Sequence, residues 1–110
     1  MGGEPENVAV VPLAGEIDLA SAPDAERRIA EAEKGEPSEI VLDLREVTFM
    51  DSSGLRILLA AHHRAGEQGR EFALVSGPAV ERLLEMTGLT GRLRVLDEPP
   101  DPGAGSPPSD

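Results

Sequence analysis

Short apolar runs alternate with longer amphipathic stretches along the 110 residues of this chain. Runs rich in β-branched and aliphatic residues predict strands at about 8–14, 39–44, 72–75 and 93–96. The runs at 39–44 and 72–75 are nearly unbroken, which is typical of strands covered on both faces. Pro12 interrupts the first run and has no N–H to donate, so we expect an edge strand or a bulge there. The segment Gly15-Glu16-Ile17-Asp18 is expected to turn the chain.

Helical spacing of apolar residues follows the first three runs. Ser21, with Asp24 three residues later, predicts a helix over about 21–34 that ends near Gly35-Glu36-Pro37. A second helix is expected over about 53–67, and a third opens at Ser76-Gly77-Pro78. The stripe predicted for the second helix comprises Leu55, Leu58 and Leu59, with His62 as its polar end, and His63 is expected to be exposed. The apolar positions of the third helix are Val80, Leu83, Leu84 and Met86.

Strands that alternate with helices predict an α/β fold, because consecutive parallel strands need helical crossovers. We expect a single domain over residues 8–96, with a small, mostly parallel or mixed sheet of about four to five strands and helices packed on it. Residues 1–7 are expected to form a flexible N-terminus. Residues 97–110, rich in Pro, Gly, Ser and Asp, are expected to form a disordered acidic tail that can be deleted without loss of the fold.

Composition excludes several classes of function. The formal net charge is -11 and Lys34 is the only lysine, so the basic surface that nucleic acid binding requires is missing. Phe49 and Phe72 are the only aromatic residues, which leaves little for stacking a base or a flavin. No apolar run approaches the ~20 residues of a membrane span, and the acidic start of the chain does not resemble a secretion signal. The absence of cysteine also gives no sign of an oxidising compartment, so we expect a cytoplasmic protein.

The sequence disfavours a serine hydrolase, a zinc site built on histidines and a nucleotide-binding loop. Ser52 and His62 bracket about ten helical residues, or roughly 15 Å, so they cannot form a hydrolase pair with Asp51. His62 and His63 are adjacent rather than i, i+4, and no phosphate-cradling Gly-rich motif is present.

A Mg²⁺-dependent phospho-receiver built on Asp18, Asp43 and Asp51 is a further alternative from the enzyme class. It would take an acyl phosphate on a carboxylate, but an adjacent acidic pair and a late lysine are both missing. We expect no enzymatic activity and no cofactor or metal bound by the chain itself.

The most informative segment joins a predicted buried strand to the second helix, at Phe49-Met50-Asp51-Ser52-Ser53-Gly54-Leu55. Ser52 and Ser53 are expected at or beside the N-cap, where a hydroxyl can accept a helix N–H and where the macrodipole favours added negative charge. A phosphate would fit there. Taken alone, however, this local pattern is also ordinary helix capping.

Several separated segments together resemble the STAS domain family and, within it, the bacterial anti-sigma factor antagonists. They are residues 15–18, residues 40–55 with Asp51-Ser52-Ser53-Gly54-Leu55, and residues 80–89 with Thr87-Gly88-Leu89. Two features depart from the family pattern. Few residues precede the first strand, so we expect the family's extra N-terminal strand to be short or absent. Arg56 stands where many members have a second glycine.

The resemblance implies a switch rather than a catalyst. It implies that an anti-sigma factor with serine kinase activity, which brings its own ATP and Mg²⁺, phosphorylates Ser52, and that a phosphatase resets it. The surface facing the partner would comprise Asp18, Asp51, Ser52, Ser53, Gly54, Leu55 and Arg56, and the free protein would be a monomer. The alternative within the same fold is a permanent binding subunit of a membrane transport complex or a stress-sensing assembly, in which the serines only cap the helix.

Overall fold

The elements of the fold follow the predicted order along the chain. The computed structural model describes residues 7–100. Its elements are β1 (Val8–Ile17), α1 (Ala22–Lys34), β2 (Glu39–Met50), α2 (Ser52–Glu67), β3 (Glu71–Val75), α3 (Pro78–Met86) and β4 (Val95–Leu96). The expected flexible N-terminus lies outside the described residues except for Asn7, and so does the expected tail after Pro100. Both therefore stay predictions.

The strands form one sheet in the order β1-β2-β3-β4. Every neighbouring pair is parallel, and a helix connects each strand to the next. The predicted α/β fold with about four to five strands is confirmed.

Strand β1 lies at one edge of the sheet, and Pro12 borders an irregularity in its pairing. The register of β1 against β2 shifts between Pro12 and Ala14 and again between Gly15 and Glu16. Gly15 takes a φ of +76°, a conformation that favours glycine, in this irregular stretch. The edge position expected from Pro12 is confirmed.

The turn expected at residues 15–18 was wrong in its position. β1 continues to Ile17, which pairs with Met50 at the end of β2, and the chain turns only after it. Both strands are longer than their apolar runs because each pairs along the full length of the other. The pairing, which a local apolar pattern does not encode, extends the strands to the edge where the candidate site lies.

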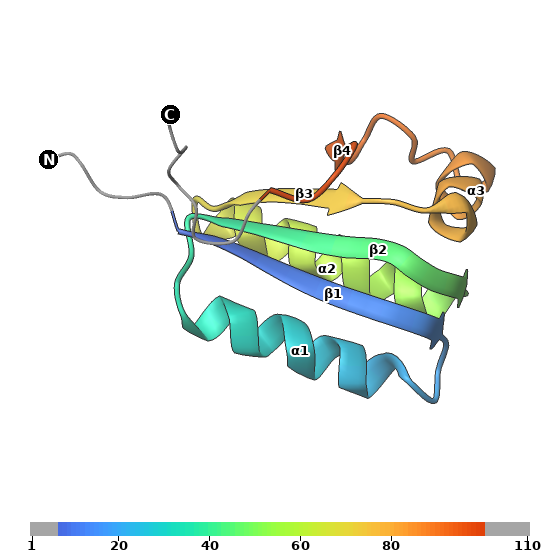
Figure 1. Cartoon of the computed structure of the whole chain (residues 1–110), viewed down its shortest axis with the longest axis horizontal. Helices are drawn as coiled ribbons and strands as arrows, with labels where there is room; N and C mark the ends of the chain where they lie inside the picture. The colour runs from blue at the N-terminus through green and yellow to red at the C-terminus, as the bar shows by residue number, and fades with distance from the viewer. Residues whose placement is uncertain (1–6, 101–110) are drawn as a thin grey trace, which may run out of the picture.

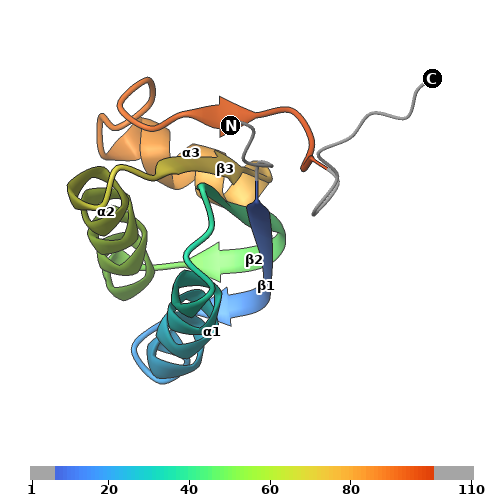
Figure 2. The same cartoon turned by 90° about the vertical axis from the view of Figure 1, so that its left-hand side faces the viewer.

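Helices α1 and α2 cover one face of the sheet (Figures 1 and 2). Ile40, Leu42 and Leu44 of β2 point into the main core beneath them. Val41 faces the other way and joins a smaller buried cluster with Ala73 and Val75. Figure 2 shows that none of the helices in residues 7–100 covers this second face.

Helix α3 packs against the C-terminal half of β2 (Figure 1). Its N-cap, Gly77, approaches the strand so closely that a Cβ there would lie 3.0 Å from the carbonyl oxygen of Arg45. Met86 at the end of α3 is 75% exposed, so the expectation that it is one of the packed apolar positions was wrong.

The buried stripe of α2 differs from the predicted one. Leu58 is buried and Leu55 is half-buried, but Leu59 and His62 are exposed. The buried positions are Gly54, Ile57, Leu58, Ala61 and Ala65. The prediction followed the large apolar residues, whereas the buried stripe includes small residues that let α2 approach the sheet and α1.

His62 lies at the margin of this stripe rather than within it. Its ring stands edge-on to Phe72, with the ring centroids 5.6 Å apart. The contact is that of an exposed side chain resting on the border of the core, which accounts for its helical spacing with the leucines.

Gly54 sets how closely α2 approaches the strand ends. A Cβ at this position would lie 2.5 Å from Cγ of Met50, 3.0 Å from Cγ2 of Ile17 and 3.1 Å from the carbonyl oxygen of Ile17. Such contacts require the helix or the strands to move. Gly66, in the same helix, has nothing within 4 Å of its Cβ position.

The two glycines therefore predict opposite effects of alanine. Gly54→Ala is expected to lower the free energy of unfolding by about 1–3 kcal/mol through overpacking. Gly66→Ala is expected to raise it by about 0.5 kcal/mol, because alanine has less backbone freedom to lose on folding than glycine and its Cβ would meet no other atom. Urea denaturation of both variants measures this, and a stabilised Gly54→Ala variant would contradict the close approach.

Candidate functional site

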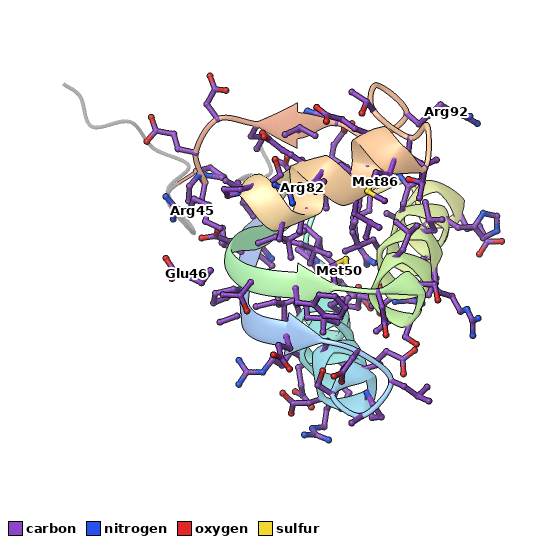
Figure 3. All side chains as sticks on the ribbon, turned by 90° about the vertical axis from the view of Figure 1, so that its right-hand side faces the viewer. Arg45, Glu46, Met50, Arg82, Met86 and Arg92 are labelled. Carbon is purple, nitrogen blue, oxygen red and sulfur yellow. The ribbon has the colours of Figure 1, made fainter. Side chains whose placement is uncertain are left out.

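The candidate site lies where β1 and β2 end side by side. Ile17 pairs with Met50, so the next residues, Asp18 and Asp51, leave the sheet at the same edge. The N–H of Asp51 donates to the carbonyl of Ile17 at 3.3 Å. The structure thereby joins two predicted site segments that are about 30 residues apart in the sequence. Figure 3 views the molecule from this end, with Met50 in the sheet and Arg82 and Met86 on α3.

Asp51, not a serine, is the N-cap of α2. Its Oδ1 accepts hydrogen bonds from the N–H groups of Ser53 at 2.8 Å and Gly54 at 3.3 Å. Its backbone is extended, as an N-cap requires. Ser52 and Ser53 therefore lie beside the N-cap, as predicted, but the acceptor of the helix N–H groups is the carboxylate of Asp51 and not a serine hydroxyl. The carboxylate fills that position one residue earlier.

Ser52 is the first residue of α2 and is exposed. Within residues 7–100 its hydroxyl has no hydrogen-bond partner. Ser53 is half-buried by comparison. The hydroxyl of Ser52 is therefore free for chemistry without loss of a contact that holds the helix.

Asp18 is held in a tight turn before α1. Its Oδ1 accepts from the N–H groups of Ala20 at 3.1 Å and Ser21 at 3.0 Å. The Ser21 hydroxyl lies 3.2 Å from the same oxygen and donates to the carbonyl of Glu16 at 2.7 Å. The hydrogen bond from the backbone N–H of Ser21 is the largest of the causes that lower the pKa of Asp18. Asp18 thus stays charged beside the site.

The rest of the predicted segment combines buried and exposed positions. Gly54 is buried against the strand ends, Leu55 is half-buried and Arg56 is exposed. Only part of this segment, Ser52 and Arg56 above all, can therefore present its side chain to another molecule.

Two exposed apolar side chains flank the segment, and sequence reasoning did not identify them as exposed. Leu19, directly after Asp18, is 78% exposed, and Phe49, two residues before Asp51, is 49% exposed. The strand period offered a signal for Phe49: Met50 packs beneath Gly54, so its neighbour faces the other way. Exposed large apolar residues beside a loop mark a candidate contact surface.

The three carboxylates considered for a Mg²⁺ site, Asp18, Asp43 and Asp51, do not form a metal-binding cluster. Asp43 forms a two-pronged pair with Arg45, at 3.0 Å from Nε to Oδ1 and 2.9 Å from Nη2 to Oδ2. This hydrogen-bonded pair lowers the pKa of Asp43. In the described part of the chain, no group of three or more His, Cys, Asp or Glu residues is placed to hold a metal ion.

Over the same residues, no helix is both long and apolar enough to cross a membrane.

Residues 3–98 match the sequence family described as the STAS domain. The chain belongs to the STAS domain family. This STAS domain is 34% identical over 89 residues to the anti-sigma-F factor antagonist RsfB of Mycobacterium tuberculosis, covering 81% of this chain and 73% of that protein. It is 33% identical to the anti-sigma-B factor antagonist of Bacillus subtilis, covering 84% and 82%.

A solved structure shows the same fold. The crystal structure of an anti-sigma factor antagonist from Mycobacterium paratuberculosis is similar with a TM-score of 0.76 and 34% identity, over 87% of this chain and 82% of that one. The resemblance stated from the sequence is confirmed at the level of the family, and its homologues bear the name of anti-sigma factor antagonists.

The cap of this STAS domain is open to a direct test. Asp51→Ala is expected to lower the free energy of unfolding by about 1 kcal/mol, because two N–H groups lose their acceptor. Asp51→Asn keeps an oxygen acceptor and loses only the charge at the helix N-terminus, so a loss of about 0.3–0.5 kcal/mol is expected. Thermal and urea denaturation compare the two. Equal losses would assign the effect to charge rather than to capping.

Proposed function

We propose that this STAS domain is an anti-sigma factor antagonist that works as a switch. In its unmodified form it binds an anti-sigma factor and so frees a sigma factor for transcription. Phosphorylation of Ser52 ends that binding. The observation that carries the proposal is the hydroxyl of Ser52, which is exposed, unpaired within residues 7–100 and seated at the start of α2.

The proposed partner is an anti-sigma factor with serine kinase activity that supplies ATP and Mg²⁺. The γ-phosphoryl group passes from ATP to Oγ of Ser52, ADP leaves, and the hydroxyl proton passes to a base of the kinase. A phosphatase hydrolyses the phosphoserine and restores the binding form. The names of the homologues at 33–34% identity support an anti-sigma factor as the partner.

The proposed contact surface comprises the predicted residues together with the exposed apolar pair, Leu19 and Phe49. Asp18 and Asp51 belong to this surface, and the hydrogen bond from the N–H of Asp51 to the carbonyl of Ile17 joins the two chain segments that carry them. The apolar pair supplies area to bury, while the neutral hydroxyl of Ser52 can enter a close interface at low desolvation cost.

Charge explains how modification would release the partner. A phosphoserine carries about -1.5 to -2 at neutral pH. It would stand next to the carboxylate of Asp51 on a chain whose formal net charge is already -11. Burying it against a fitted partner adds desolvation and repulsion, and a coupling of ~3 kcal/mol weakens binding roughly 150-fold.

The identity of the cap also bears on the alternative, a permanent subunit of a transport or stress-sensing assembly. That alternative accounts for the serines as capping residues. Because Asp51 provides the cap, capping does not account for Ser52. This observation favours the switch.

Phosphosite mapping is the first test. The protein is incubated with ATP, Mg²⁺ and a candidate anti-sigma kinase from the same source, and intact mass and peptide spectra are recorded. One added phosphate on Ser52 is expected in the wild type and in Ser53→Ala, and none in Ser52→Ala. Phosphate on Ser53, or on neither serine with any cognate kinase, would overturn the proposal.

Partner affinity provides a second test by calorimetry. Ser52→Ala is expected to bind the anti-sigma factor as the unmodified wild type does, because it keeps a small neutral side chain. Ser52→Asp is expected to bind about tenfold more weakly, which corresponds to about 1.4 kcal/mol. Ser38→Asp adds the same charge just before β2, at the opposite end of that strand, and serves as the control. Equal affinity of all four proteins would rule out the switch.

A further inference from the structure

Arg56 lies four residues after Ser52 on α2 and is exposed. Most basic side chains of this acidic protein have a carboxylate partner. These are Arg27 and Arg28 with Asp24, Lys34 with Glu31, Arg45 with Asp43, Arg64 with Glu33, and Arg94 with Glu39 and Glu71. Over residues 7–100, Arg56 has no such partner, and neither do Arg70, Arg82 and Arg92, but of these four only Arg56 lies on α2. Its guanidinium is therefore available to an anion that is absent from the unmodified protein.

A phosphate on Ser52 would need a cation. The helix N–H groups that commonly bind a phosphate at such a position are those of Ser53 and Gly54, and both already donate to Asp51. Asp51, which precedes Ser52, and Asp18, which leaves the sheet at the same edge, repel a second anion. The helix N-terminus therefore gives the phosphate less support than an uncapped terminus would.

The spacing on α2 places Arg56 to supply that support. Residues i and i+4 lie on the same face of a helix, with Cβ atoms about 5–6 Å apart. An anion on the N-terminal side of the cation is the favourable order. The planar guanidinium can also donate two parallel hydrogen bonds to phosphate oxygens, which a lysine cannot.

We propose that Arg56 is the positioning residue for the phosphate of phosphorylated Ser52. The guanidinium pairs with the phosphate along the first turns of α2 and holds it at the surface of the free protein. Pairing also withdraws an exposed positive charge from the contact surface, so modification changes two charges seen by the partner. The proposal rests on the proposed function, because that function puts the phosphate on Ser52.

The second pKa of the phosphate measures this pairing directly. Phosphoserine is introduced at residue 52 during translation, so no kinase is needed, and the phosphate is titrated by ³¹P NMR. In Arg56→Ala the second pKa is expected to rise by about 0.3 relative to the phosphorylated parent, because the dianion loses its cation. Arg56→Lys is expected to restore part of the difference, because the charge remains and the two-pronged geometry is lost.

Arg82→Ala is the matched control. Arg82 is an exposed arginine on α3 at the same end of the molecule (Figure 3), but it lies on another helix. Asp18 and Asp51, which leave the sheet beside Ser52, are the same in every variant. The second pKa in Arg82→Ala is expected to stay close to that of the parent, and circular dichroism checks that each variant is folded.

Equal second pKa values of the phosphate in folded Arg56→Ala and Arg82→Ala would overturn the proposal, because the loss of one positive charge anywhere on the protein would then account for the shift. Failure of this proposal can be distinguished from failure of the proposed function. If no cognate kinase modifies Ser52, the switch fails while the titration still reports whether Arg56 pairs with a phosphate. If Ser52 is modified but the titration shows no effect of Arg56, the switch stands without a positioning arginine.

Discussion

The close approach of α2 to the ends of β1 and β2 determines the geometry of the candidate site. Gly54 makes this approach possible, because a side chain there would overlap Met50 and Ile17. The hydrogen bond from the N–H of Asp51 to the carbonyl of Ile17 joins the two strand ends just before the helix. These contacts leave little freedom in the direction of the first turn of α2, which carries Ser52.

Neighbouring residues of this segment have different roles in the structure. Asp51 accepts hydrogen bonds from the helix N–H groups, and Gly54 allows α2 to lie close to the strand ends. The hydroxyl of Ser52 makes no hydrogen bond within the described residues. A hydroxyl that does not hold the fold can be modified without unfolding it. A switch that acts through charge alone needs such a hydroxyl on a rigid support.

The main features of the fold could be predicted from the sequence. Residues of β2 and β3 are buried on both faces of the sheet, although helices α1 and α2 cover only one of them, so both strands could be recognised as continuous apolar runs. Pro12 likewise marked an edge strand. The stripe of α2 was only partly predicted, because periodicity of large side chains overlooks buried alanine and glycine. Ala61 and Ala65 are buried because α1 and the sheet lie close to them, and that proximity belongs to the tertiary structure.

By itself, the sequence determined the α/β class, the order of the elements and the segment that holds Ser52. These features depend on local periodicity and on a motif of a few consecutive residues. Only the tertiary structure decided that Asp51 provides the cap, that Asp18 leaves the sheet beside it, and that Leu19 and Phe49 are exposed near both. The reason is geometric: contacts between residues about 30 positions apart depend on strand register, and a one-residue change in register moves every side chain to the other face.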